Sequence, residues 1–176
     1  MIETERLRFR RWRIKDARAY QALTREPAVA RTLGTPPTLA RARAIIATQN
    51  ATLDAAGFCF WPLELKADGR FAGWCGVKFG PDHTPIAGEP EIGWTLHPNL
   101  HGHGYAREAA TAVLAWFWAH TARPRLFAIT TPGNRASWGL MERLGMVRVP
   151  GGDFDHPALE EGDPLRRHLT YVIARP

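Results

Sequence analysis

The sequence predicts a mixed α/β (α+β) fold in which a mostly antiparallel central sheet is flanked by helices. Three strand patterns follow one another between residues 58 and 97, and a tight turn joins the first two. The clearest helical pattern, over 105–120, comes next, and from there helices and strands alternate. The chain has 176 residues, 45% hydrophobic and 23% charged, which suits one domain over residues 1–176.

The N-terminal third contains one strand pattern and two helical patterns. Apolar and charged side chains alternate over 6–13, which predicts a half-buried strand whose charges share one solvated face. Asp16 is a suitable cap for a short helix over 16–25. A second helix is predicted over 38–56 and ends at Gly57.

The middle of the chain predicts three strands. Residues 58–66 and 71–79 have the composition of strands, and the Ala-Asp-Gly-Arg turn at 67–70 favours a hairpin between them. A loop rich in Pro and Gly follows over 80–89. Residues 90–97 form the next predicted strand, which a proline closes.

The C-terminal part alternates helices and strands. Over 105–120 the apolar side chains recur at the spacing of one buried helix face: Ala106, Ala109, Ala110, Val113, Leu114 and Phe117. The remaining patterns predict a strand at 126–131, a helix at 134–144, and strands at 146–149 and 165–174. The loop over 150–164 is long for a compact domain, which is typical of a functional loop. The predicted element order is βααβββαβαββ.

The composition argues against several classes of protein. No apolar run is long enough to span a membrane, and the N-terminus has no apolar signal-peptide core. The net charge of +6 suggests nucleic acid, but the basic residues, 20 of 23 of them Arg, are scattered along the chain. Cys59 and Cys75 form no metal or redox motif and are expected to be buried thiols in a reducing cytosol. We therefore expect a cytoplasmic protein without a membrane or nucleic-acid partner; the oligomeric state stays open.

The segment 91–106 runs from a predicted strand through a turn with two glycines, Gly102 and Gly104, into the clearest helix. Such a turn leaves backbone N–H groups unpaired at the positive end of the helix dipole, which suits phosphate. The glycines let the backbone approach the anion closely. Alone, the pattern is equally typical of a simple tight turn, and it matches neither a Walker loop nor a dinucleotide fingerprint.

Three histidines in the same segment, His97, His101 and His103, raise the question of a metal site. Their spacing fits no single helix face, and no cysteine or carboxylate joins them as an obvious ligand. We therefore expect no metal.

A second informative segment, 130–146, predicts on its own only an ordinary helix with Asn134 as its N-cap. Together with the rest of the chain it completes five segments in a fixed order: 3–10 (ETERLRFR), 91–94 (EIGW), 102–109 (GHGYAREA), 134–137 (NRAS) and 142–146 (ERLGM). Over nearly the whole length, this order resembles the GNAT acetyltransferase superfamily, and within it the ribosomal-protein-alanine N-acetyltransferase type.

The resemblance implies that acetyl-coenzyme A is the acetyl donor and co-substrate, bound in a V-shaped cleft where two central strands splay apart. It implies that the turn at 102–106 holds the pyrophosphate, that 95–97 pairs with the pantetheine as a strand does, and that Asn134 bonds the cofactor arm. The implied cofactor-binding residues are Thr95, Leu96, His97, His101, Gly102, His103, Gly104, Tyr105, Ala106 and Asn134.

The candidate catalytic residues are Glu91 and Ser137. Glu91 is placed to take the amine proton through a water, although an exposed strand-end carboxylate has the same pattern. A backbone N–H near Leu96 is a candidate donor to the thioester carbonyl. Many family members carry a Tyr as general acid where this chain has Met141. Ser137 is therefore the candidate acid for the leaving thiolate, unless it only closes the first helical turn.

The predicted acceptor is an amine. The loop 150–164 is acidic in an otherwise basic chain and holds Asp153, Asp155, Glu160, Glu161 and Asp163. Such a loop attracts a cationic amine, or it is simply a solvated surface loop. Three functions remain: an N-acetyltransferase for a peptide or protein N-terminus, one for a small amine such as a polyamine, amino acid or aminoglycoside, and a non-catalytic acyl-coenzyme A-binding module.

Overall fold

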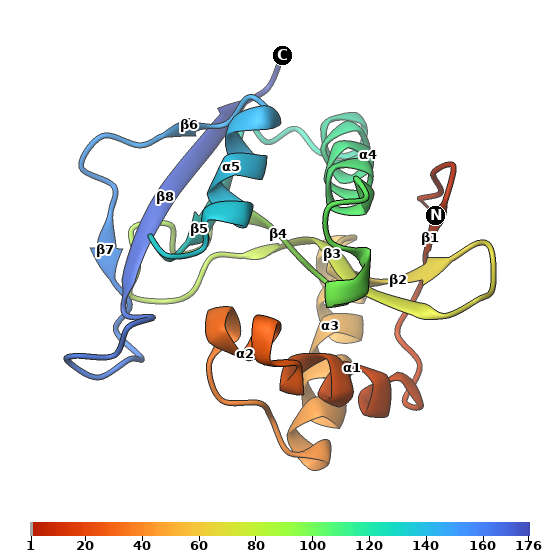
Figure 1. The fold of residues 1–176 in the computed structure, drawn as a ribbon. Coiled ribbons are helices and arrows are strands. Elements are labelled where there is room, and N and C mark those ends of the chain that lie inside the picture. The colour runs from red at the N-terminus through yellow and green to blue at the C-terminus, as the bar shows by residue number, and fades with distance from the viewer. Residues whose placement is uncertain (1) are drawn as a thin grey trace.

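The computed structural model describes residues 2–176 as one mixed sheet with helices on both faces (Figure 1). The helices are α1 (Asp16–Arg25), α2 (Pro27–Leu33), α3 (Leu39–Ala56), α4 (Tyr105–His120) and α5 (Arg135–Arg143), with the 3₁₀ helix η1 (Pro98–Leu100). The strands are β1 (Leu7–Phe9), β2 (Phe60–Leu65), β3 (Phe71–Phe79), β4 (Pro90–Leu96), β5 (Arg125–Thr130), β6 (Val147–Arg148), β7 (Phe154–Asp155) and β8 (Arg167–Ala174).

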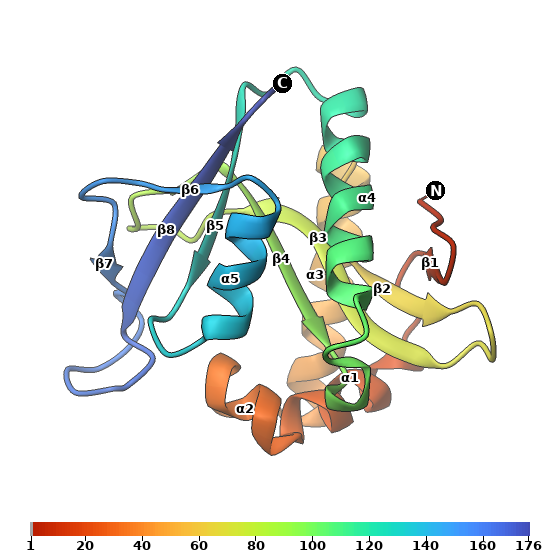
Figure 2. The same cartoon turned by 45° about the horizontal axis from the view of Figure 1, so that its top comes forward.

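The eight strands lie in the order β1-β2-β3-β4-β5-β8-β6, with β7 paired to β8. All neighbours are antiparallel except β4 and β5, which are parallel. The helices α1, α2 and α3 cover one face, and α4 and α5 cover the other (Figures 1 and 2). This arrangement confirms the predicted mixed, mostly antiparallel sheet flanked by helices. Within residues 2–176, no helix is long and apolar enough to cross a membrane.

Each face of the sheet has its own core. On the α4 side, Phe117 is fully buried in a cluster that also holds Leu63 and Val77 of the sheet. On the α1 to α3 side, Trp74 of β3 lies in a separate buried cluster with Ile46 of α3. The two cores hold the sheet between the helical layers and fix the N-terminus of α4 just beyond the end of β4.

The strongest sequence patterns are confirmed. The predicted stripe of α4 is buried, except for the half-buried Ala106: Ala109, Ala110, Val113, Leu114 and Phe117. The N-terminus of α3 is capped by Thr38, whose hydroxyl accepts the Arg41 N–H at 3.2 Å. Gly57 ends this helix in the left-handed conformation, with φ 80°. Local capping chemistry therefore fixes the bounds of α3.

Three short elements were not predicted: α2, η1 and β7. α2 has seven residues and buries only Val29, so it has no apolar stripe to detect. β7 has two residues, too few for any alternation. These elements depend on contacts with the rest of the fold rather than on local pattern.

Two predictions at the N-terminus are wrong. Asp16 does not cap α1; its carboxylate lies within the first turn and accepts the Arg13 N–H at 2.8 Å. Arg10 is not solvated, because only 9% of it is exposed. Its guanidinium pairs with Asp16 at 2.7 Å and with Glu64 of β2 at 3.0 Å. The apolar and charged side chains over 6–13 do alternate, but the ion pair with Asp16 buries the charge of Arg10.

Candidate active site

The sheet opens between β4 and β5. These strands have seven and six residues, yet only one register pair, Glu91↔Phe127, joins them. Beyond it the two strands diverge, as Figure 2 shows. The opening has the V shape that the resemblance implies, with Glu91 at its apex.

The edge of β4 that faces this opening carries unpaired backbone groups. On the opposite edge the His97 N–H donates to the Ala72 carbonyl at 2.9 Å, and N–H directions alternate along an antiparallel strand. The N–H groups of Trp94 and Leu96 therefore point toward β5, beyond the point where β5 pairs. The Leu96 carbonyl accepts a hydrogen bond from His101 Nε2–H at 2.9 Å, since a carbonyl can only accept. Strand-like pairing in the opening is thus left to the N–H groups of Leu96 and Trp94 and to the Trp94 carbonyl.

The turn after β4 presents backbone donors at the start of α4. Gly102 and Gly104 have φ of 78° and 82°, the left-handed region that favours glycine. Gly104 is the N-cap residue, and no side chain caps the helix. The first helical bond is donated by the Glu108 N–H to the Gly104 carbonyl at 3.0 Å. The N–H groups of Tyr105 and Ala106 precede it and lack a helical acceptor, which makes this terminus suitable for an anion.

The three histidines of this segment are spread over different contacts. His97 Nε2 lies 3.9 Å from Glu26 Oε1, and His101 bonds β4. His103 is exposed, and its backbone carbonyl accepts a hydrogen bond from Arg6 at 3.0 Å. In residues 2–176, no three His, Cys, Asp or Glu side chains are grouped so that they could hold a metal ion.

Glu91 is buried and faces the α1 to α3 layer. Ile92 and Leu96 belong to the core on the α4 side, so the odd-numbered residues of β4 point to the other face. Only 6% of Glu91 is exposed, and its Oε2 lies 3.2 Å from Lys78 Nζ. No hydrogen bond of regular geometry reaches Oε2 from the described part of the chain. The alternative of an exposed strand-end carboxylate is wrong.

Burial also sets the protonation behaviour of Glu91. Loss of hydration raises the pKa of its carboxyl above 4.5, and the ammonium of Lys78 only partly opposes this. A buried carboxylate with an unsatisfied oxygen and a raised pKa is typical of a group that accepts a proton during a reaction.

An aromatic cluster from β7 and β8 lies near Lys78. The ring of His168 stacks on that of buried Phe154 with centroids 5.4 Å apart, and the ring of His156 lies 5.2 Å from His168. Burial lowers the pKa of both imidazoles, and the charge of Lys78 lowers them further. Both imidazoles are therefore uncharged at neutral pH.

Asn134 and Ser137 lie at the start of α5. The Ser137 N–H donates to Asn134 Oδ1 at 3.3 Å, so only the amide NH₂ of Asn134 stays free for another partner. Met141 is 2% exposed and part of the core, so it offers no acid. Because α5 lies on the face opposite to α1 to α3, Ser137 and Glu91 approach the sheet from opposite sides.

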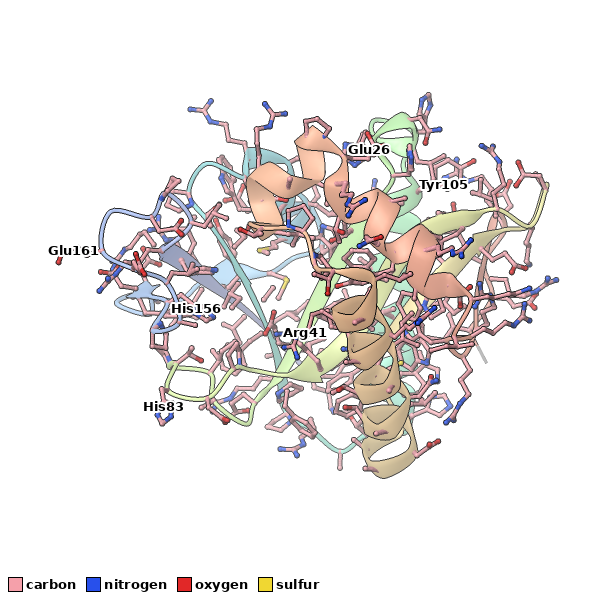
Figure 3. All side chains as sticks on the ribbon, turned by 90° about the horizontal axis from the view of Figure 1, so that it is seen from below. Glu26, Arg41, His83, Tyr105, His156 and Glu161 are labelled. Atoms are coloured by element: carbon pink, nitrogen blue, oxygen red, sulfur yellow. The ribbon has the colours of Figure 1, made fainter. Side chains whose placement is uncertain are left out.

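The acidic loop is less negative than its sequence suggests. Asp153 pairs with Arg148, and Asp155 pairs with Arg166 at 3.7 Å and Arg167 at 3.3 Å. These arginines flank the loop in sequence, just outside the range over which its acidic residues were counted. In Figure 3, Glu161 lies at the outer margin of the molecule and His156 lies farther in.

Comparison with known proteins agrees with this architecture. Residues 6–147 match the family described as "Acetyltransferase (GNAT) domain". The chain belongs to this family. It is 34% identical over 90 residues to the uncharacterized protein YkkB of Bacillus subtilis strain 168, covering 51% of each chain. This chain spans about half, or less, of the length of the curated relatives it matches.

Solved structures share the GNAT fold over nearly the full length. An acetyltransferase from Agrobacterium tumefaciens is 28% identical, with a TM-score of 0.77, covering 98% of this chain and 92% of the other. RimL, a ribosomal L7/L12 α-N-protein acetyltransferase in complex with coenzyme A, has a TM-score of 0.75 at 13% identity, covering 97% and 95%. At that identity the likeness to RimL shows the fold alone.

Sequence reasoning missed two contributors to this GNAT site. Lys78 becomes a neighbour of Glu91 only through the register of β3 on β4. Arg6 reaches the turn from the N-terminal segment, 97 residues away in sequence from the carbonyl that it bonds. The sequence gives no local signal for either contact, because both arise from the packing of distant segments.

Proposed function

We propose that this protein is an acetyl-coenzyme A-dependent N-acetyltransferase of the cytoplasm. It transfers the acetyl group to a primary amine by direct attack in a ternary complex, and the acceptor is the α-amino group of a peptide or protein. The observation that carries the proposal is the opening between β4 and β5, which has unpaired N–H groups on its edge and an anion-binding turn at its end.

The residues present suit the chemical groups of acetyl-coenzyme A. The turn at 102–106 offers backbone N–H groups and the positive end of α4 to the pyrophosphate. The Trp94 N–H faces the opening, where it binds an amide of the pantetheine arm as a neighbouring strand does, and the Leu96 N–H stays available for the thioester carbonyl. The free NH₂ of Asn134 adds a donor from α5. No step in this scheme needs a metal.

Acetyl-coenzyme A supplies an activated thioester, and the chain's own groups handle charge and protons. Glu91 takes the proton of the attacking amine through a water, because its raised pKa makes it a stronger base than a solvated carboxylate. The Leu96 N–H donates to the carbonyl oxygen as negative charge develops there. Ser137 passes a proton to the leaving thiolate from the opposite side of the sheet and takes one back from water, so that no alkoxide is left. A thiol ionises more readily than an alcohol, so the thiolate also leaves without full protonation.

The choice of a peptide amine rests on the sequence resemblance and on the charges near the site. A polycationic acceptor needs several free carboxylates, but two of the five in the loop, Asp153 and Asp155, are paired with arginines, and Glu161 lies at the outer margin of the molecule (Figure 3). The aromatic cluster of Phe154, His156 and His168 is suited instead to an apolar side chain beside the amine.

An acceptor screen tests the proposal. The release of free coenzyme A thiol is followed with panels of peptides, polyamines, amino acids and aminoglycosides, with Glu91→Gln as the inactive control. We expect turnover with peptides and a large loss in the variant. Turnover only with polyamines or antibiotics refutes the peptide acceptor. Binding of acetyl-coenzyme A with no turnover on any panel shows a non-catalytic acyl-coenzyme A-binding module.

Calorimetry tests the metal-free binding separately. Acetyl-coenzyme A is titrated into the protein in the presence of a chelator, and we expect the same affinity as in its absence. Binding that disappears with the chelator refutes the backbone-based site.

A further inference from the structure

Arg6 connects the N-terminal segment to the turn at the start of α4. Its Nε and Nη2 each lie 2.6 Å from Glu108 Oε2, and its Nη1 donates to the His103 carbonyl at 3.0 Å. The guanidinium carbon lies 4.0 Å from the centroid of the Tyr105 ring. One side chain thus contacts the turn and the first helical residues at three separate points.

Glu108 is fully engaged by the same segment. Its Oε1 accepts the backbone N–H of Arg6 at 2.9 Å and the hydroxyl of Thr4 at 2.5 Å. Burial alone would raise the pKa of this carboxyl, but the hydrogen bonds from Thr4 and Arg6 together outweigh burial and lower it. Glu108 therefore carries a full negative charge in the first turn of α4.

That charge lies where a phosphate has to bind. A carboxylate in the first helical turn competes with an anion for the free N–H groups and for the positive end of the dipole. The guanidinium of Arg6 neutralises Glu108, and three hydrogen bonds and the ion pair direct its two oxygens toward the N-terminal segment. The donors of the turn are left available as a result.

The turn also needs support from outside. Two left-handed glycines make it flexible, and no side chain caps the helix that it starts. A flexible binding loop loses affinity because ordering it costs conformational entropy when the ligand binds. The Arg6 bond to the His103 carbonyl lies between the two glycines in sequence and restricts that freedom before the ligand arrives.

We propose that Arg6 is a positioning residue for coenzyme A: it holds the turn 102–106 in its anion-binding form and neutralises Glu108 beside it. The proposal rests on the proposed function, because it assigns the pyrophosphate to this turn. Arg6 itself does not touch the ligand in this account; it acts through His103 and Glu108.

The test compares Arg6→Met and Arg6→Lys with the matched control Arg8→Met. Arg8 is an exposed arginine of β1 that pairs with Glu3 and Glu64 and contacts no part of the turn. Coenzyme A affinity is measured by calorimetry, and hydrogen exchange is measured in the free proteins at the Glu108 amide, which donates the first helical bond to the Gly104 carbonyl of the turn. Lysine keeps the charge and most of the stem, so Arg6→Lys carries the test if Arg6→Met does not fold.

We expect both Arg6 variants to bind coenzyme A roughly tenfold more weakly and to exchange the Glu108 amide faster. Lysine at position 6 does not restore the coenzyme A affinity, because one ammonium group cannot bond Glu108 and the His103 carbonyl in the fork geometry of a guanidinium. Arg8→Met stays within about twofold of the wild type. Wild-type affinity in Arg6→Met, full rescue by lysine, or unchanged exchange overturns the inference. A wild-type protein that does not bind coenzyme A refutes the proposed function instead.

Discussion

Substitution of Gly104 should weaken coenzyme A binding through backbone strain alone. Gly104 has φ 82° and ψ −4°, and a Cβ built there meets nothing closer than Arg6 Nη2 at 3.5 Å, an ordinary contact. The cost of a side chain is therefore conformational: an L-residue in this region costs about 1–2 kcal/mol, and a β-branched one more. If the strained turn relaxes out of its binding form, Gly104→Val should bind coenzyme A roughly 5- to 30-fold more weakly.

Two comparisons isolate that effect. His103→Ala keeps the backbone and the carbonyl that Arg6 bonds, so we expect its affinity to stay within about twofold. Gly88 has φ 72° and open space around it, but it lies in the loop before β4. Gly88→Val therefore costs similar strain without touching the turn and should bind coenzyme A normally.

The assay is calorimetry on the folded variants, with thermal melts to confirm folding. Similar losses in Gly104→Val and His103→Ala, with both folded, would point to an imidazole-based site. Similar losses in Gly104→Val and Gly88→Val would show that general destabilisation explains the result. Either outcome refutes the backbone assignment.

Three further predictions follow. Glu91→Gln should lower turnover roughly 10²- to 10⁴-fold without changing coenzyme A affinity, a deficit that shrinks as pH rises and frees the amine. Since burial raises the pKa of Glu91, the wild-type kcat/KM should begin to fall on acidification while the pH is still above 4.5. A kcat/KM that does not change with pH in the wild type and in Glu91→Gln would contradict this. Burial raises the pKa of Cys59 to about 12 and raises that of Cys75, so iodoacetamide should label neither until urea unfolds the chain. Asp16→Ala should cost about 3 kcal/mol in urea unfolding, because the buried Arg10 loses its bidentate carboxylate and keeps only Glu64 and the Arg11 carbonyl as partners; a loss below roughly 1 kcal/mol would contradict this.

The sequence predicted the elements whose signals are local. The bounds of α1, α4 and β3 agree with the prediction residue by residue, because a helical stripe or a strand pattern ended at a clear turn signal. The one parallel junction of the sheet also follows from the order of elements, since a helix between two strands gives a crossover.

The electrostatics could not be predicted in the same way. The solvated face expected for 6–13 is partly buried, because Arg10 finds Asp16 and Glu64 only once β1 pairs with β2. Two of the five acidic residues of the loop, Asp153 and Asp155, are paired with arginines that flank it. A charge pattern gives the sign of each residue, but the partner of each charge depends on how the chain folds and how its strands pair.

The position of Glu91 and the opening of the sheet have a common cause. β5 pairs with β4 at a single residue, and that residue is Glu91. Where the strands still pair, the sheet shields the side chain from water, and this burial raises the pKa of the carboxyl. Beyond that point β4 has lost its neighbour, so the Trp94 and Leu96 N–H groups stay free. The strand β4 thus provides the proposed base through its side chain and backbone donors through its free edge, and a longer β4–β5 pairing would remove the donors while keeping Glu91 buried.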